Sequence, residues 1–342
     1  MRQSTTALCL ITLSVVTTVT PLSTPPVRRT PYDSQFYPGR FVGEHVCTAP
    51  SSLPSSLLAL NSAIEPQIER QIESQIELLD HLNINHAPNT HPSLLSFYKD
   101  TLGFTLDERK LGNVKAGKGT VWVNAGANQL HLSEGKLKAQ VVDGKVRLNV
   151  FSEEKLRDVE REARDKGFFL SSTENEITLT CPYGNVFELS IGPPDPRGSQ
   201  PGSKPSETVA GLREIEPHVS SPSDLAGVEK FYASVFGCET RREGDSVNVP
   251  FGPLQSLRFT QGPIENDDYE DGTGPHVSLY VRSLPSVWDK AEDLGLVYVN
   301  PRFKRKAHTL EEARKQCMFR VLWIVDPEDG RKIMRLEHEI RR

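Results

Sequence analysis

The sequence has little of several features that would point to particular classes of protein. Only five of its 342 residues are cysteines, and no two of them form a C-x-x-C pair. This spacing argues against a zinc knuckle and gives no clear disulfide framework. The formal net charge is only -5, from 40 basic and 45 acidic residues, and both signs are interspersed. The chain therefore lacks the basic footprint of a nucleic-acid-binding protein.

Long hydrophobic runs are also scarce. The run from Ala7 to Val16 follows Arg2 and is short for a bilayer span, so it resembles the hydrophobic region of a secretory signal. No second run reaches spanning length, and we expect no integral membrane association.

Residues 25–62 are rich in Ser, Thr, Pro and Arg and contain only two acidic residues, Asp33 and Glu44. This composition is typical of a transit peptide or of a disordered N-terminal segment. Residues 1–60 are thus expected to be a targeting leader and disordered segment. Such a leader resembles a bipartite plastid leader; extracellular secretion is the rival reading, and an untargeted, merely disordered N-terminus is the alternative to both.

A short isoleucine repeat follows the leader. In "QIERQIESQIEL" and the residues before it, Ile64, Ile68, Ile72 and Ile76 recur at every fourth position. This period is close to that of an α-helix with one apolar stripe, so the repeat predicts a linker helix over residues 61–79. Such a helix is either a docking element or a plain spacer.

From residue 80 onward a pattern of strand, helix and three strands occurs four times. "FYKDTLG" begins at Phe97 and "FYASVFG" at Phe231, and each stretch ends a predicted helix with a glycine. Residues 192–210 contain the Pro/Gly/Ser-rich stretch "GPPDPRGSQPGSKPSE", which is typical of a linker. The sequence therefore predicts an α+β protein of four βαβββ units paired into two tandem domains, 80–191 and 211–342.

These motifs carry a family likeness. The stretches "DHLNINHAPNTHPSLLSFYKDTLGF", "NQLHL", "CPYGNVFELS", "SDLAGVEKFYASVFG" and "GPHVSLYV", in this order, resemble the vicinal oxygen chelate superfamily. That superfamily includes glyoxalase I, bleomycin resistance proteins and extradiol dioxygenases. The resemblance spans roughly residues 80–340 and implies that each domain is a curled mixed sheet forming a cup for one divalent metal ion. It is specific for the fold and weak for the reaction, because this fold hosts many chemistries.

The resemblance implies a set of metal ligands in the first domain. His81, His131 and Glu188 match the family's ligand positions, and Glu188 is also the candidate catalytic proton shuttle. Arg147 stands where the family often has another histidine. Strand alternation independently places these residues on polar faces, opposite apolar neighbours. Two histidines and a carboxylate suit a divalent zinc, iron, manganese or nickel ion.

Further polar residues on the same strands are candidates for substrate binding. Arg147 is placed to clamp an anionic group, and Trp122 to stack on a planar one. Asn124, Gln129 and Asn149 share the polar faces of their predicted strands. The expected ligand is a small molecule with two adjacent oxygens.

Two other histidines lie in the turn after the first strand. His86 and His91, in "NHAPNTH", have no helical spacing that favours metal capture. They are interpreted as surface or rim residues.

The second domain matches the ligand pattern less well. His276 falls at a ligand position, but Arg258 and Met334 replace the other ligands, and Glu337 lies too far along its strand to substitute. The second site is therefore expected to be degenerate.

The sequence favours a metal-dependent lyase, isomerase or oxygenase. The residue at Arg147 argues against the extradiol type, which usually builds its site on a histidine there. Two alternatives remain open, which are a metal-free binding protein of the bleomycin-resistance type and a non-catalytic relic. The sequence does not indicate an oligomeric state.

Overall fold

The computed structural model describes residues 74–135, 139–200, 203–252 and 254–342. The expected leader and the expected linker helix up to Glu73 lie outside the described residues. In the described part the helix prediction is wrong, because strand β1 begins at Ile76. Isoleucine fits a strand when a partner is present, and Ile76 pairs with Val281 of β13. Within the described ranges, no helix is long and apolar enough to cross a membrane.

The described chain forms four units of strand, helix and three strands, as the sequence predicts. The first unit comprises β1 (Ile76–His86), α2 (His91–Leu94) with the π-helix η2 (Leu95–Thr101), β2 (Thr105–Leu106), the 3-10 helix η3 (Glu108–Lys110), α3 (Leu111–Ala116), β3 (Val121–Ala125) and β4 (Asn128–Glu134). The second comprises β5 (Gly144–Val150), α4 (Glu153–Lys166), β6 (Phe169–Ser172), β7 (Glu176–Thr180) and β8 (Val186–Ile191).

The last two units repeat this order with one added helix. The third comprises β9 (Val209–Val219), α5 (Pro222–Phe236), β10 (Arg241–Glu243), β11 (Ser246–Phe251) and β12 (Gln255–Gln261). The fourth comprises β13 (His276–Val281), α6 (Leu284–Asp293), β14 (Val297–Tyr298), α7 (Leu310–Gln316), β15 (Met318–Val325) and β16 (Lys332–Arg341).

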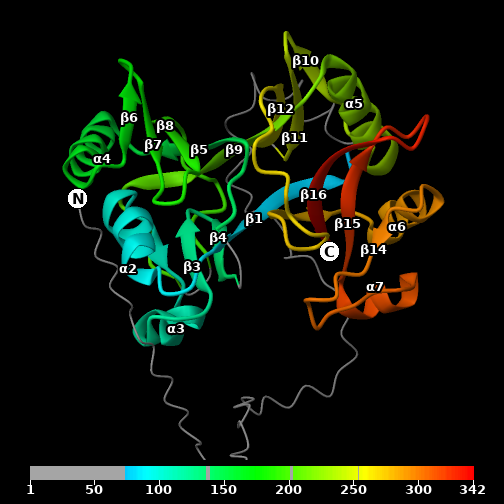
Figure 1. Cartoon of the computed structure of the whole chain (residues 1–342), viewed down its shortest axis with the longest axis horizontal. Coiled ribbons are helices and arrows are strands. Elements are labelled where there is room, and N and C mark those ends of the chain that lie inside the picture. The colour runs from blue at the N-terminus through cyan, green and yellow to red at the C-terminus, as the bar shows by residue number, and fades with distance from the viewer. Residues whose placement is uncertain (1–73, 136–138, 201–202, 253) are drawn as a thin grey trace, which may run out of the picture. The chain divides into compact units, whose positions relative to one another are not determined.

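Two eight-stranded mixed sheets result, which confirms the predicted fold class (Figure 1). Sheet A has the order β14-β15-β16-β13-β1-β4-β3-β2, and sheet B has the order β10-β11-β12-β9-β5-β8-β7-β6. In each sheet the first strands of two units join antiparallel at the centre, as β1 with β13 and β5 with β9. Neither sheet closes into a barrel.

The units are not paired in chain order, and this corrects the sequence expectation. Sheet A joins the first unit to the fourth, and sheet B joins the second unit to the third. Each sheet thus takes one unit from each of the expected domains 80–191 and 211–342. The strand pattern could not reveal which units pair, because each unit pairs through its first strand and the four first strands have the same pattern.

Consecutive units instead contact each other through their helices. The repeated aromatic pairs explain this, because all four rings are almost fully buried. Phe97 and Tyr98 of η2 lie against Phe187 of β8, with ring centres 5.3 and 5.7 Å apart. Between the third and fourth units, Tyr232 of α5 makes a 2.7 Å hydrogen bond with His338 of β16. One continuous apolar core therefore packs against both sheets. The opposite face of each sheet carries polar side chains.

Candidate functional site

Alternation along the central strands of sheet A gathers histidines on one face. Asn83 of β1 pairs with His131 of β4 on one side and with His276 of β13 on the other. His81 lies two residues before Asn83, on the same face of β1. The intervening Leu82 is buried on the opposite side, in the apolar core. We call the side of sheet A that carries these histidines polar face A.

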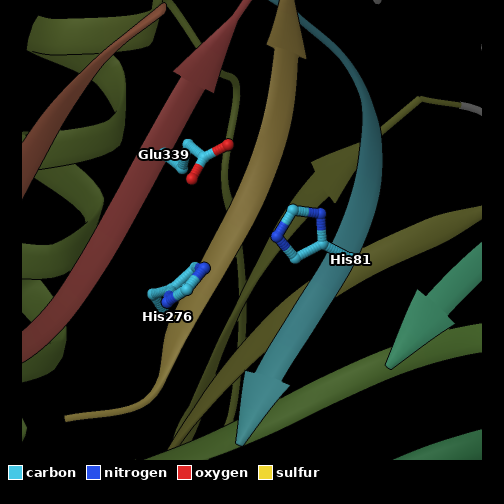
Figure 2. Close-up of side chains that lie close together, drawn as sticks. All are labelled: His81, His276 and Glu339. Atoms are coloured by element: carbon cyan, nitrogen blue, oxygen red, sulfur yellow. The ribbon is translucent and has the colours of Figure 1, made fainter. Parts of the chain in front are cut away.

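Three side chains on polar face A form a compact cluster. One donor atom each of His81, His276 and Glu339 lies within 4.8 Å of the others. Figure 2 shows that they come from three adjacent strands, β1, β13 and β16, and converge on one point. All three residues are at most 5% exposed. Within the described ranges this is the one group of three or more histidine, cysteine or carboxylate side chains close enough to hold a metal ion.

A neighbouring carboxylate orients the first of these histidines. Asp80 Oδ2 lies 2.9 Å from Nδ1 of His81 and 3.3 Å from a guanidinium nitrogen of Arg341. Burial alone would raise the pKa of Asp80, but its contacts with His81 and Arg341 lower it. The ionised carboxylate accepts a hydrogen bond from the Nδ1–H group of His81, so the lone pair of this histidine is at Nε2.

Two arginines hold the carboxylate of the cluster. Glu339 accepts hydrogen bonds from Arg320 of β15 and from Arg341 of its own strand. Burial would raise the pKa of Glu339, but these two guanidinium groups lower it to about 2. Burial and the charge of Arg320 lower the pKa of His276 well below its usual value. The cluster thus combines an ionised carboxylate with a neutral imidazole.

His131 lies beside the cluster but is not part of it. Its ring stacks on His81, with centres 3.8 Å apart, and on Trp122 of β3, with centres 4.2 Å apart. Burial and the nearby histidines hold its pKa well below the usual range. The structure therefore brings together two of the three expected ligands, His81 and His131, but places His131 in a stacked column.

The predicted substrate residues on polar face A surround this column. Trp122 has the charged ends of Arg109 and Lys110 over its ring at 4.8 and 4.5 Å. Gln129 donates to Asn124 at 2.7 Å, and both side chains are buried. These three predicted residues lie together on β3 and β4, within the same face as the histidine cluster.

The other predicted residues lie on sheet B, apart from the histidines. Glu188 of β8 is not a member of the cluster, and its carboxylate contacts Lys145 and Arg147. Burial would raise the pKa of Glu188, but these two cations lower it. Arg147 also forms ion pairs with Glu214 and Glu216 of β9, so three carboxylates surround its guanidinium. We call this side of sheet B polar face B.

Asn149, the remaining predicted substrate residue, is also on sheet B. Its side-chain amide donates to the backbone oxygen of Pro193 at 3.1 Å. This contact connects β5 to the segment that follows β8.

Sequence reasoning missed two members of the cluster. His276 was assigned to a degenerate site, and Glu339 was not considered. Counting from the glycine turn pointed to Met334, but β16 has ten residues and a register irregularity opposite β15. The available signal was the alternation of Glu337 and Glu339 toward one face, next to His276 and Ser278 of β13.

The donor set of the cluster fits a divalent metal ion. Two imidazole nitrogens and one carboxylate are ligands for zinc and for other borderline divalent ions, with positions left open for a substrate. The Asp80 contact to His81 is the outer contact that a ligating histidine usually makes. An ion bound here would share Glu339 with Arg320 and Arg341, whose charges oppose a cation.

Similarity to known proteins is found among solved structures. No family model matches the chain, and no curated protein matches it. A proposed dioxygenase from Bacillus subtilis is 12% identical over 78% of this chain and 86% of its own, with a TM-score of 0.49. Glyoxalase I from Zea mays is 13% identical over 77% and 92%, with a TM-score of 0.45.

A third solved structure extends the range of similar enzymes. A 2,3-dioxygenase from Pseudomonas sp. KL28 is 12% identical over 78% of this chain and 93% of its own, with a TM-score of 0.28. At such TM-scores these likenesses carry no argument, and the description of the site rests on the strand register and the contacts given above.

Proposed function

We propose that polar face A is a divalent-metal site and that the protein is a metal-dependent enzyme acting on a small molecule with adjacent oxygens. The observation that carries the proposal is the convergence of His81, His276 and Glu339 to within 4.8 Å. A divalent ion bound there would supply Lewis-acid chemistry to the two substrate oxygens. The reaction class is a lyase or isomerase step, or an oxygenation if the ion is iron.

The chain's own residues then have distinct tasks. Asp80 fixes the orientation of His81. Trp122 stacks on His131 and has Arg109 and Lys110 over its ring, so it supports the stacked column. Arg320 and Arg341 bring positive charge next to the cluster. They favour a substrate that carries negative charge on its oxygens, because such a group can share the guanidinium donors with Glu339.

The arginines also support a second candidate, a metal-free pocket that binds a small anionic molecule. Arg320 and Arg341 both pair with Glu339, so this carboxylate has cationic partners without a bound ion. In that case the histidines would serve as hydrogen-bonding groups for the ligand. The metal-site candidate predicts that replacing a residue of the cluster lowers the metal content of the protein. The metal-free candidate predicts no change in metal content.

The test is a metal count on the purified protein. The full chain would be produced in medium containing zinc, iron, manganese and nickel, purified without chelator, and analysed by plasma mass spectrometry. We expect His276→Gln to lose one equivalent of metal relative to the wild type. His218→Gln, in a partly exposed histidine that bonds the backbone of Pro263, is the matched control and should lose none.

Equal metal content in the wild type and in His276→Gln would overturn the metal proposal. The metal-free candidate would then be tested with small dicarboxylates or 2-oxoacids by calorimetry, with Arg320→Gln as the variant expected to lose binding.

A further inference from the structure

Two histidines outside polar face A are buried, which corrects the sequence interpretation of them as surface or rim residues. His86 and His91 are each only 1% exposed. His86 Nδ1 lies 2.8 Å from the carbonyl oxygen of Ala87, and His91 Nε2 lies 2.8 Å from that of Gly119. These contacts hold the turn after β1 in place.

A cavity of about 180 Å³ lies on the apolar side of β1. Leu82, whose side chain is opposite polar face A, forms part of its wall. The rest of the wall comes from residues 141–143 before β5, the end of β9, the segment 264–275 before β13, and β16. Aliphatic side chains from four of these five segments line it, namely Leu82, Ile215, Val219, Ile264, Ile333 and Leu336.

The size and lining of this cavity suit a small apolar group. An apolar cavity of about 150 Å³ is large enough to bind benzene, so this one has room for one aromatic ring or about six carbons of a chain. Ile264 is 39% exposed although it is a large aliphatic residue, and the neighbouring wall residue Asp267 is exposed too. These two residues mark the side of the cavity that faces solvent.

The segment on the solvent side is held in place by defined hydrogen bonds. Asp143 accepts from the backbone N–H groups of Glu265 and Asn266 at 3.1 and 2.9 Å, and from the side-chain amide of Asn266 at 2.7 Å. The hydroxyl of Tyr269 accepts from the backbone N–H of Val141 at 2.8 Å. The wall is therefore preorganised, and both carboxylate oxygens of Asp143 already have donors.

One wall residue has hydrogen-bond donors without an acceptor among the described residues. The side chain of Arg335 is 15% exposed, and its buried Nε and Nη1 atoms make no hydrogen bond there. A carboxylate oxygen of Asp271 lies 3.5 Å from Nε, which is long for a hydrogen bond, and that acid is itself exposed. Because arginine keeps its charge and a buried N–H without an acceptor is unfavourable, this position favours an anion.

We propose that this cavity binds a small monocarboxylate with an apolar body, which is an aromatic ring or a short alkyl chain. The apolar body would lie among the aliphatic side chains, and the carboxylate would accept hydrogen bonds from Arg335. One arginine balances one negative charge, so a monocarboxylate fits better than a phosphate dianion. The proposal does not depend on the function of polar face A, because the cavity lies on the other side of β1.

The test is a calorimetric titration of the full chain with three probes. Phenylacetate has both a ring and a carboxylate, 2-phenylethanol has the ring without the charge, and acetate has the charge without the ring. We expect one equivalent of phenylacetate to bind per chain. The alcohol should bind at least about tenfold more weakly, because it lacks the charge-assisted hydrogen bond to Arg335, and acetate should show no binding at the same concentration.

Three substitutions separate the contribution of Arg335 from that of other arginines. Arg335→Met removes the donors and keeps an apolar stem, so it should weaken phenylacetate binding by about 10–100-fold and leave 2-phenylethanol binding nearly unchanged. Arg157→Met is the matched control on α4, where the side chain is 73% exposed, and should change neither. Arg320→Gln alters polar face A and should also leave phenylacetate binding unchanged.

A second measurement locates the ligand without any substitution. Three isoleucines line the cavity, Ile215, Ile264 and Ile333. In protein labelled at the isoleucine methyl groups, phenylacetate should shift the NMR signals of these three residues. The signals of Ile76 and Ile177, which lie outside the cavity wall, should not move. A folding failure of Arg335→Met therefore does not prevent the test.

Three results would overturn the proposal. The first is that phenylacetate does not bind, which would indicate that water satisfies the donors of Arg335. The second is that phenylacetate binds equally well to the wild type and to Arg335→Met, or shifts isoleucine signals outside the cavity wall only. The third is that binding is lost in Arg320→Gln and kept in Arg335→Met, which would place the carboxylate on polar face A.

Discussion

Replacing Arg147 by methionine tests whether polar face B is a structural ion-pair network. The side chain of Arg147 is 16% exposed and bonds three carboxylates that are at most 10% exposed. Without it, Lys145 still contacts Glu188, and Arg258 still lies 3.4 Å from Glu214. Glu216 loses the only ion-pair partner that the described residues give it.

Removing one partner of a buried ion pair costs about 3–5 kcal/mol, because the remaining charge stays buried without compensation. We expect Arg147→Met to lower the free energy of unfolding by about this amount at pH 7, as measured by urea denaturation followed by circular dichroism. The lower end is the better expectation, since two of the three carboxylates keep a second cation.

The pH dependence makes the test sharper. In the wild type the folded-state pKa of Glu188 is lowered, so its contribution to stability is present above the unfolded pKa and is lost as pH falls through the folded pKa. Arg147→Met removes one of the two cations that lower the pKa of Glu188, so this contribution is smaller in the variant. The variant should therefore lose less stability than the wild type as pH falls through the folded-state pKa of Glu188.

A second substitution provides the matched control. Adding Glu216→Gln to Arg147→Met removes the unpaired charge, so the double variant should recover part of the lost stability. If Arg147→Met unfolds within about 1 kcal/mol of the wild type and shows the same pH trend, the network is not structural. Arg147 would then be available as the substrate clamp that the sequence suggested.

Three further substitutions test other parts of the structure. Asp80→Asn, which weakens the contact that orients His81, should reduce metal affinity at the cluster by about 10–100-fold in a zinc titration, and an unchanged affinity would contradict this role. Tyr232→Phe leaves Nε2 of the buried His338 without its donor and should cost about 1–3 kcal/mol in urea denaturation; a neutral effect would show that the hydrogen bond contributes little. Gly144→Ala places a methyl group 1.7 Å from a backbone oxygen of β9 at a φ of +128°, so we expect little soluble protein, and normal expression would contradict the close approach.

Local structure was predictable where the sequence alone determines it. Ser152, a residue type that favours this position, caps α4 with its hydroxyl accepting from the backbone of Lys155, and Gly237 ends α5 in the left-handed region. Strand alternation correctly put His81 and His131 on one face of the same sheet. The helix ends, and the side of its own strand on which each histidine lies, depend on residues that are close in the chain. Spacing and side-chain chemistry determine such local features.

The composition of the site was not predictable, because it depends on which units pair. Four units with the same pattern can combine in more than one way, and the local sequence of a unit does not specify its partner. Pairing the first unit with the second placed Glu188 beside the histidines, whereas the observed pairing supplies His276 and Glu339. The isoleucine repeat shows the same limit, because Ile76 fits a helix by its spacing and a strand by its pairing with β13.

The two polar faces differ in the residue at one equivalent strand position. Arg147 on β5 pairs with Glu188 on β8, and His276 on β13 occupies the same register beside Glu337 on β16. Arginine keeps its charge at every ordinary pH, so it neutralises the surrounding carboxylates permanently and leaves no lone pair for an ion. Histidine offers a lone pair when it is neutral, and burial keeps His276 neutral. The difference between these two side chains therefore leaves a neutral nitrogen ligand on sheet A, where we propose a metal site, and a fixed ion-pair network on sheet B, in units that share one architecture.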